Sequence, residues 1–130
     1  MYFSGISKEF SLRNEDQYRT IGDFWDEMTA LYGLENLRGL GYRWTKDKIF
    51  YAIGLKVGEI SGCNFCMELP DEGWTIVESK TEHLKEAYDE IYKEGALTYE
   101  IETFSENGTC QIKYCRFLEN DKTGSSGVTC

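Results

Sequence analysis

Apolar residues recur at helical spacing after Asn14, where Gln17 completes a candidate capping box. This stripe consists of Ile21, Phe24, Trp25, Met28 and Leu31. Gly22 lies inside the segment, where it weakens a helix but permits close packing against it. The pattern predicts a first amphipathic helix whose stripe faces the core.

A second apolar stripe follows Ser79, where Glu82 completes the same capping signal. The stripe consists of Leu84, Ala87, Tyr88, Ile91 and Tyr92. Gly95 is a typical residue at which a helix ends. We therefore predict a second helix. Four aromatic residues lie on the two stripes, and we expect all of them to pack in the core: Phe24, Trp25, Tyr88 and Tyr92.

Segments with strand-like patterns surround both helices. They are residues 2–6, 39–44 and 48–57 around the first helix, and residues 74–79, 97–104 and 110–117 around the second. The turns TKDK and SENG join the last two strands of each set as hairpins. The order strand, helix, strand, strand thus occurs twice, over residues 1–60 and 70–118. This predicts one α+β domain over residues 1–120, with antiparallel sheets, two helices and a cleft between the halves.

The two predicted halves are joined by a long connection, VGEISGCNFCMELPDEG, and the chain ends in a small, polar segment, DKTGSSGVTC. We expect residues 121–130 to form a flexible tail. Cys63 and Cys66 form a C-x-x-C pair, but a zinc ribbon would need a second such pair at a suitable distance. We interpret the five cysteines of the chain as ordinary reduced thiols and expect no metal site.

The formal net charge of −9 argues against a nucleic-acid partner, which requires clustered Lys and Arg. An acidic protein can instead attract cationic ligands over long distances. No apolar run is long enough to cross a membrane and the first residues do not form a signal peptide, so we expect a cytoplasmic protein. Aromatic residues make up 15% of the chain, which suits a pocket for flat organic ligands and cations.

One predicted strand places two carboxylates on the same face. In TYEIETF, Glu100 and Glu102 share a face with Phe104, while the alternate residues point the other way. Charged strand residues usually face solvent, and exposure is the simpler interpretation. The alternative is that a carboxylate faces an aromatic pocket, where burial raises its pKa and an organic cation supplies the missing charge.

The chain resembles the GyrI-like, or effector-binding, domain family, a domain also found in bacterial multidrug-responsive transcription regulators. The resemblance covers residues 2–118 and depends on the order and spacing of four segments: FWDEM, FYAIGLKVG, LPDEGWTIVES, and IETF with its hairpin into CQIKYCRF. It is to the stand-alone members, which have no DNA-binding segment. The last segment departs from the family in lacking a proline-containing apolar run.

The resemblance implies that Glu102 lies at the base of an aromatic pocket and meets lipophilic cations. Glu100 lies nearer the strand end, and we expect it at the rim or in solvent. The walls that we predict for the pocket are Trp74, Tyr42, Trp44, Phe104, Tyr114 and Tyr51. No cofactor is expected, since the chain contains no phosphate-binding loop and no nucleophile-elbow serine.

Three functions remain open on this basis. The first is binding of lipophilic, cationic small molecules without catalysis. The second is hydrolysis of cyclopropane-bearing genotoxic compounds, for which Glu102 would be the catalytic residue, as in some proteins of the GyrI-like fold. The third is a protein-interaction role, such as the gyrase protection known in the family, with a protein partner or a second copy of the chain.

Overall fold

The computed structural model describes residues 1–116 as seven strands, two α-helices and three short 3₁₀ helices. The strands are β1 (Tyr2–Ser11), β2 (Leu37–Tyr42), β3 (Lys48–Leu55), β4 (Phe65–Glu68), β5 (Thr75–Lys80), β6 (Tyr99–Phe104) and β7 (Thr109–Cys115). The helices are α1 (Gln17–Tyr32) and α2 (Leu84–Tyr92), and the 3₁₀ helices are Arg13–Glu15, Leu34–Asn36 and Thr81–His83. The predicted α+β class is confirmed. The predicted tail over residues 121–130 lies outside the described residues.

All seven strands form one sheet in the order β4-β1-β3-β2-β6-β7-β5. The first unit contributes β1, α1, β2 and β3, and the second contributes β5, α2, β6 and β7 in the same order along the chain. The two units join through the antiparallel pair β2 and β6, in which Gly39 lies opposite Glu102 and Gly41 opposite Glu100. The carboxylates therefore lie on the strand at the junction of the halves.

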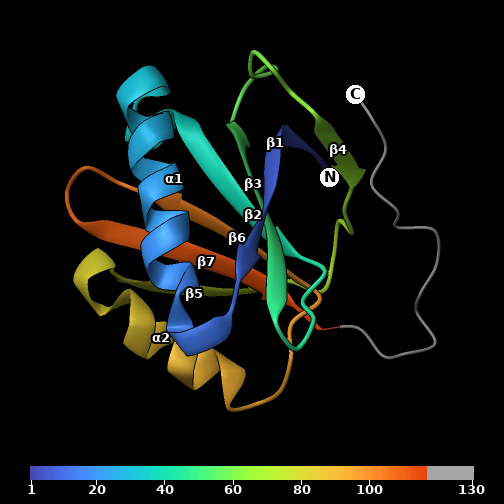
Figure 1. Cartoon of the computed structure of the whole chain (residues 1–130), viewed down its shortest axis with the longest axis vertical. Coiled ribbons are helices and arrows are strands. Elements are labelled where there is room, and N and C mark those ends of the chain that lie inside the picture. The colour runs from blue at the N-terminus through green and yellow to red at the C-terminus, as the bar shows by residue number, and fades with distance from the viewer. Residues whose placement is uncertain (117–130) are drawn as a thin grey trace.

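Both helices pack on one face of the sheet, as Figure 1 shows. On α1, Phe24, Trp25 and Met28 are buried, and on α2 the buried residues are Tyr88 and Ile91. The apolar face of α1 packs against a cluster that includes Ile53 and Phe104. Helical periodicity in the sequence therefore places α1 and α2 over the two halves of the same sheet face.

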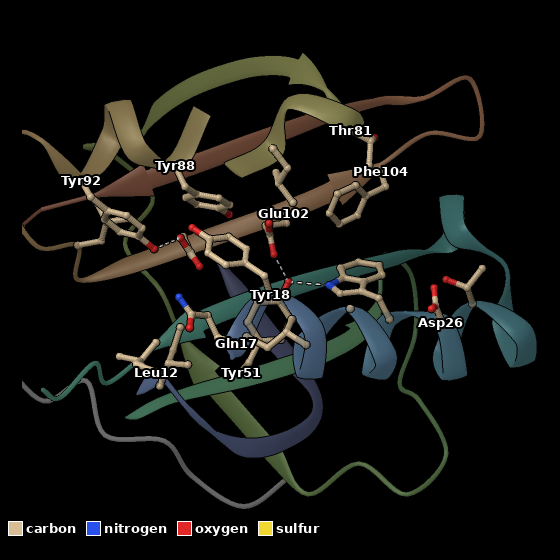
Figure 2. Close-up of a pocket in the computed structure, with 18 of the residues that line it drawn as sticks. Leu12, Gln17, Tyr18, Asp26, Tyr51, Thr81, Tyr88, Tyr92, Glu102 and Phe104 are labelled. Carbon is tan, nitrogen blue, oxygen red and sulfur yellow. Dashed lines mark hydrogen bonds between the residues drawn. The ribbon is translucent and has the colours of Figure 1, made fainter. Parts of the chain in front are cut away.

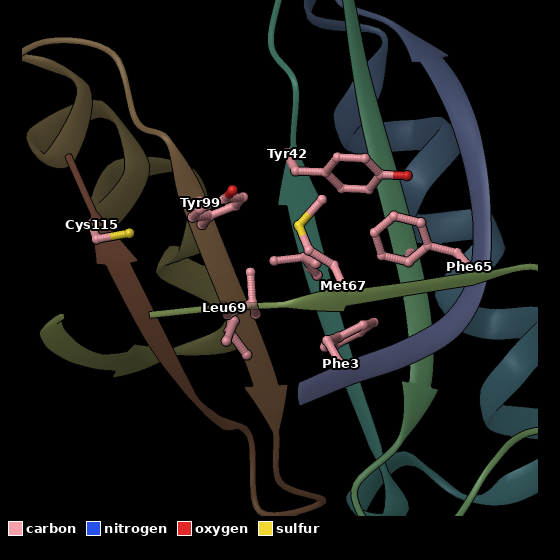
Figure 3. Close-up of a cluster of buried hydrophobic side chains, with 10 residues drawn as sticks. Phe3, Tyr42, Phe65, Met67, Leu69, Tyr99 and Cys115 are labelled. Carbon is pink, nitrogen blue, oxygen red and sulfur yellow. The ribbon is translucent and has the colours of Figure 1, made fainter. Parts of the chain in front are cut away.

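The opposite face of the sheet is covered by the start of β1 together with β4 (Figure 3). The first residues of β1 pair with β4, whereas its later residues pair with β3. The backbones of β1 and β3 touch at this change of partner, because a Cβ added to Gly54 would lie 1.9 Å from the carbonyl oxygen of Ser4. Beneath this cover lies a cluster that includes Phe3, Leu40, Met67 and Tyr99. Both faces of the central strands are thus buried.

Several local predictions are wrong. Residues 57–73, predicted as a connection between the halves, contain the strand β4. Asn14 has a left-handed backbone conformation inside a 3₁₀ helix, and Ser79 belongs to β5, so neither residue caps a helix. Leu31 is exposed although it lies on the predicted stripe. Cys66 is disulfide-bonded rather than a reduced thiol.

None of the helices in the described part of the chain is both long enough and apolar enough to cross a membrane.

Candidate functional site

The face of β6 that carries Glu100 and Glu102 turns toward the helices, and both side chains are buried. Their exposed fractions are 5% and 4%. Because β6 is a central strand with both faces covered, the alternation of its side chains does not divide them into a solvent-exposed face and a buried face. The expectation that Glu100 lies at the rim or in solvent is wrong. Tyr92, from the end of α2, donates a hydrogen bond of 3.2 Å to its carboxylate.

Two glycines of β2 make room for the groups around these carboxylates. A Cβ added to Gly39 would lie 2.0 Å from the hydroxyl oxygen of Tyr51 and 2.8 Å from Cζ2 of Trp25. A Cβ added to Gly41 would lie 2.8 Å from Oε1 of Glu100. Any larger residue at either position would displace a buried side chain. The G-x-G spacing of β2 therefore allows polar groups to lie flat against the sheet.

A chain of hydrogen bonds leads from α1 to Glu102. The indole Nε1 of Trp25 donates to the hydroxyl of Tyr51 at 2.8 Å. That hydroxyl in turn donates a hydrogen bond to Oε1 of Glu102. Figure 2 shows this chain as dashed lines on one side of the pocket. The orientation of the Glu102 carboxylate is thus set by α1, β3 and β6 together.

Burial raises the pKa of both carboxyl groups. For Glu102, burial is the principal cause, and the hydrogen bond from Tyr51 opposes it. For Glu100, burial raises the pKa well above its ordinary value, and the neighbouring charge of Glu102 raises it further. Since the two groups interact, they titrate as a pair, and the second proton is lost only at a higher pH than the first.

The carboxylates lie at a pocket of about 820 Å³ between α1 and α2. Seven aromatic side chains line it: Tyr18, Trp25, Trp44, Tyr51, Tyr88, Tyr92 and Phe104. The acidic lining residues are Asp26, Glu100, Glu102 and Glu106. Among the described residues that form the lining there is no Lys, Arg or His. The pocket is therefore aromatic and acidic, with no cationic residue of its own in the lining.

Two polar atoms in the lining are buried without a hydrogen-bond partner. One is the hydroxyl of Tyr88 and the other is Oε1 of Gln17. Tyr88 points from α2 toward Glu102 (Figure 2). Its hydroxyl is close enough to both carboxylates to lower their pKa values, yet it forms no well-shaped hydrogen bond. Buried polar groups are normally paired, so these atoms indicate where a ligand could bind.

Four of the seven predicted site residues line the pocket: Glu102, Trp44, Phe104 and Tyr51. Arg43 has a left-handed backbone conformation, with φ 52°. Arg43 lies between Tyr42, the last residue of β2, and the pocket residue Trp44. Phe104 lies on the same face as Glu102, and its ring meets that of Trp25 edge-to-face with 4.7 Å between the ring centroids. Period-two alternation correctly places Phe104 with Glu102 on the helix-covered face.

The other three predicted wall residues do not line this pocket. Tyr42 projects from the opposite face of the sheet, where its ring stacks on Phe65 at 4.6 Å (Figure 3). Trp74 packs against the same opposite-face cluster. Tyr114 shares the face of Glu100, but it packs with Ile91 of α2. Tyr42 alternates with Gly39 and Gly41, so once the glycines face the carboxylates this tyrosine must face away.

Three residues that we assigned to the core also line the pocket: Trp25, Tyr88 and Tyr92. They are part of the helical stripes, and Trp25 and Tyr88 are indeed buried, whereas Tyr92 is exposed and the expectation that it packs in the core is wrong. Their polar atoms distinguish them from purely structural core residues, because a buried hydroxyl or indole N–H needs a partner. That chemistry, together with the glycines of β2, is the signal in the sequence that could have identified this side of the pocket.

The described residues contain no group of three or more His, Cys, Asp or Glu side chains arranged to hold a metal ion. The site is therefore defined by its cavity, its aromatic walls and its paired carboxylates. Comparison of the chain with protein-family models, with curated proteins and with solved structures finds no match.

Proposed function

We propose that this protein binds lipophilic organic cations in the pocket between α1 and α2. The observation that carries the proposal is the pair of buried carboxylates in an aromatic lining without Lys, Arg or His among the described residues. A bound cation would supply the missing positive charge and would lie against aromatic faces. Each such contact contributes roughly 0.5–2 kcal/mol.

The proposal extends to the protein class. We propose that the chain is a GyrI-like effector-binding domain that binds small molecules in the cytoplasm. The repeated strand, helix, strand, strand order and the position of Glu102 at the junction of the halves support it. A role in transcription regulation would then depend on a DNA-binding segment or partner that responds to the occupied pocket.

Binding of a cationic dye tests the function. Trp25 and Trp44 line the pocket, so a bound rhodamine-type cation should quench tryptophan fluorescence. Glu102→Gln keeps the shape of the side chain but removes its charge, and we expect the affinity to fall at least about tenfold, or ~1.4 kcal/mol. The matched control is Glu78→Gln, because Glu78 is an exposed strand residue outside the pocket. Equal affinities for wild type and Glu102→Gln would contradict the proposal.

Hydrolysis is a second candidate, favoured by the hydrogen bond between Tyr51 and Glu102. Burial raises the pKa of the Glu102 carboxyl, which makes it a stronger base toward a proton of an attacking water, and Tyr51 would hold it in position. For a strained or electrophilic ligand, Glu102 would then direct the attack of water. Mass spectrometry of the ligand after incubation separates the candidates. Unchanged ligand supports binding alone, whereas a product with one water added, absent with Glu102→Gln, supports hydrolysis.

A further inference from the structure

We propose, resting on the cation-binding function above, that the pocket is built for dications, compounds with two positively charged nitrogen centres spaced to meet Glu100 and Glu102. One buried carboxylate would suffice to attract a single cation. The structure holds two of them on the same face of β6. The second carboxylate therefore needs an explanation of its own.

The two carboxylates have separate surroundings, which makes two subsites. They belong to residues i and i+2 of one strand, so their Cα atoms are separated by roughly 7 Å. Glu102 lies with Tyr51 and Phe104. Glu100 lies with Tyr92 and above Gly41. Each carboxylate thus accepts a hydrogen bond from a different tyrosine, and the pocket is large enough to hold a molecule that reaches both.

Charge balance favours two cationic centres over one. The lining offers no Lys, Arg or His among the described residues, and the negative charges of Glu100 and Glu102 repel each other. A monocation would neutralise one carboxylate, and the other would keep its proton because its charge would be unpaired in a dry site. A dication would allow both groups to ionise, and each buried charge would then have a partner.

Two further polar atoms of the lining, on Tyr88 and Gln17, fit the same occupant. The Tyr88 hydroxyl is buried beside both carboxylates without a well-formed hydrogen bond. When the carboxylates ionise, this hydroxyl gains a strong acceptor. Oε1 of Gln17 is likewise buried in the lining without a partner, and it can accept from a ligand N–H group. Oε1 of Gln17 therefore lies where it can meet a polar group of the ligand, and the Tyr88 hydroxyl lies where it can bond to the carboxylates once the ligand has ionised them.

A pair of quaternary ammonium probes tests the proposal: para-xylylene-bis(trimethylammonium) and its singly charged analogue, 4-methylbenzyl-trimethylammonium. Neither probe titrates, so every proton released on binding comes from the protein. Calorimetry in two buffers of different ionisation enthalpy measures affinity and proton release together. We expect the dication to bind wild type at least about tenfold more tightly than the monocation and to release more protons. Its affinity should rise with pH, because binding favours the ionised carboxylates.

Glu100→Gln separates this proposal from the function on which it rests. We expect the variant to lose the preference for the dication, so that the ratio of the affinities for dication and monocation falls from at least about tenfold to about one. Glu78→Gln, with the same loss of charge on the surface, should keep the preference. If wild type binds the monocation and prefers it or treats both probes alike, the dication proposal fails and cation binding stands. If neither probe nor the cationic dye binds, the proposed function itself fails.

Discussion

Glu100 and Glu102 lower the stability of the folded protein at neutral pH, since an ionised carboxylate loses its hydration when it is buried. A carboxyl group whose pKa is raised by folding holds its proton more tightly in the folded state than in the unfolded chain. The contribution of such a carboxyl group to stability is therefore most favourable below its pKa in the unfolded chain. This contribution is lost as the pH rises from that pKa through the higher pKa of the folded state. Selection for packing alone would favour apolar residues at these positions.

Glu100→Gln should therefore stabilise the protein in a pH-dependent way. Below the ordinary pKa of glutamate, about 4.3, the carboxyl is protonated in both states and the substitution has no such effect. Above the raised folded-state pKa, the variant should unfold with a free energy at least about 1 kcal/mol higher than wild type, because one pKa unit corresponds to ~1.4 kcal/mol. Urea unfolding at pH 4 and pH 8 measures the difference, and Glu78→Gln is the control. A gain of the same size at both pH values would refute this linkage.

At the scale of elements, the pocket exists because β2 and α1 each leave space where a side chain would normally stand. Gly39 and Gly41 have no side chains on this face of β2, so Tyr51 and Glu100 can lie directly against the backbone of the strand. Gly22 of α1 also lines the pocket, but no atom lies within 4 Å of a Cβ added there. The close packing that we expected at Gly22 is therefore absent, and its lack of a side chain leaves open space instead.

Gly39→Ala and Gly22→Ala should have opposite effects. At Gly39 the added methyl group would overlap the buried ring of Tyr51, so we expect a loss of about 1–3 kcal/mol in unfolding free energy and weaker dye binding. At Gly22 the methyl group meets only open space in a helix, so we expect a gain of about 0.5–1 kcal/mol. Thermal unfolding and dye titration of both variants check this. Similar effects at the two glycines would show that the clearance at Gly39 is not needed.

At the scale of the whole molecule, a chain with a net negative charge contains a pocket that is itself acidic. The chain carries a formal net charge of −9, and Asp26 and Glu106 add exposed carboxylates to the lining near the buried pair. The long-range field should draw cations toward the opening, whereas the contacts that retain them are inside. Approach and retention of the ligand should therefore respond differently to salt.

The association rate of a cationic dye should fall severalfold as ionic strength rises from 0.01 to 0.1 M, because the Debye length falls from about 30 Å to about 10 Å. The dissociation rate should change much less, since buried charges are poorly screened. Stopped-flow quenching of the pocket tryptophans measures both rates. A salt effect confined to dissociation would contradict long-range steering.

The sequence by itself determined the α+β class, the helical stripes, the hairpins and the shared face of Glu100, Glu102 and Phe104, because these features follow from local periodicity and turn chemistry. Only the tertiary structure decided that this face is dry. Burial depends on which strand is central, and here β6 pairs with β2 on one side and with β7 on the other, in a part of the sheet that is covered on both faces. The same pairing turned Gly39 and Gly41 toward the carboxylates and Tyr42 away from them. Helical spacing could identify Tyr88 and Tyr92 as inward-facing, but their distance from Glu100 was set by contacts between segments that are not neighbours in the chain.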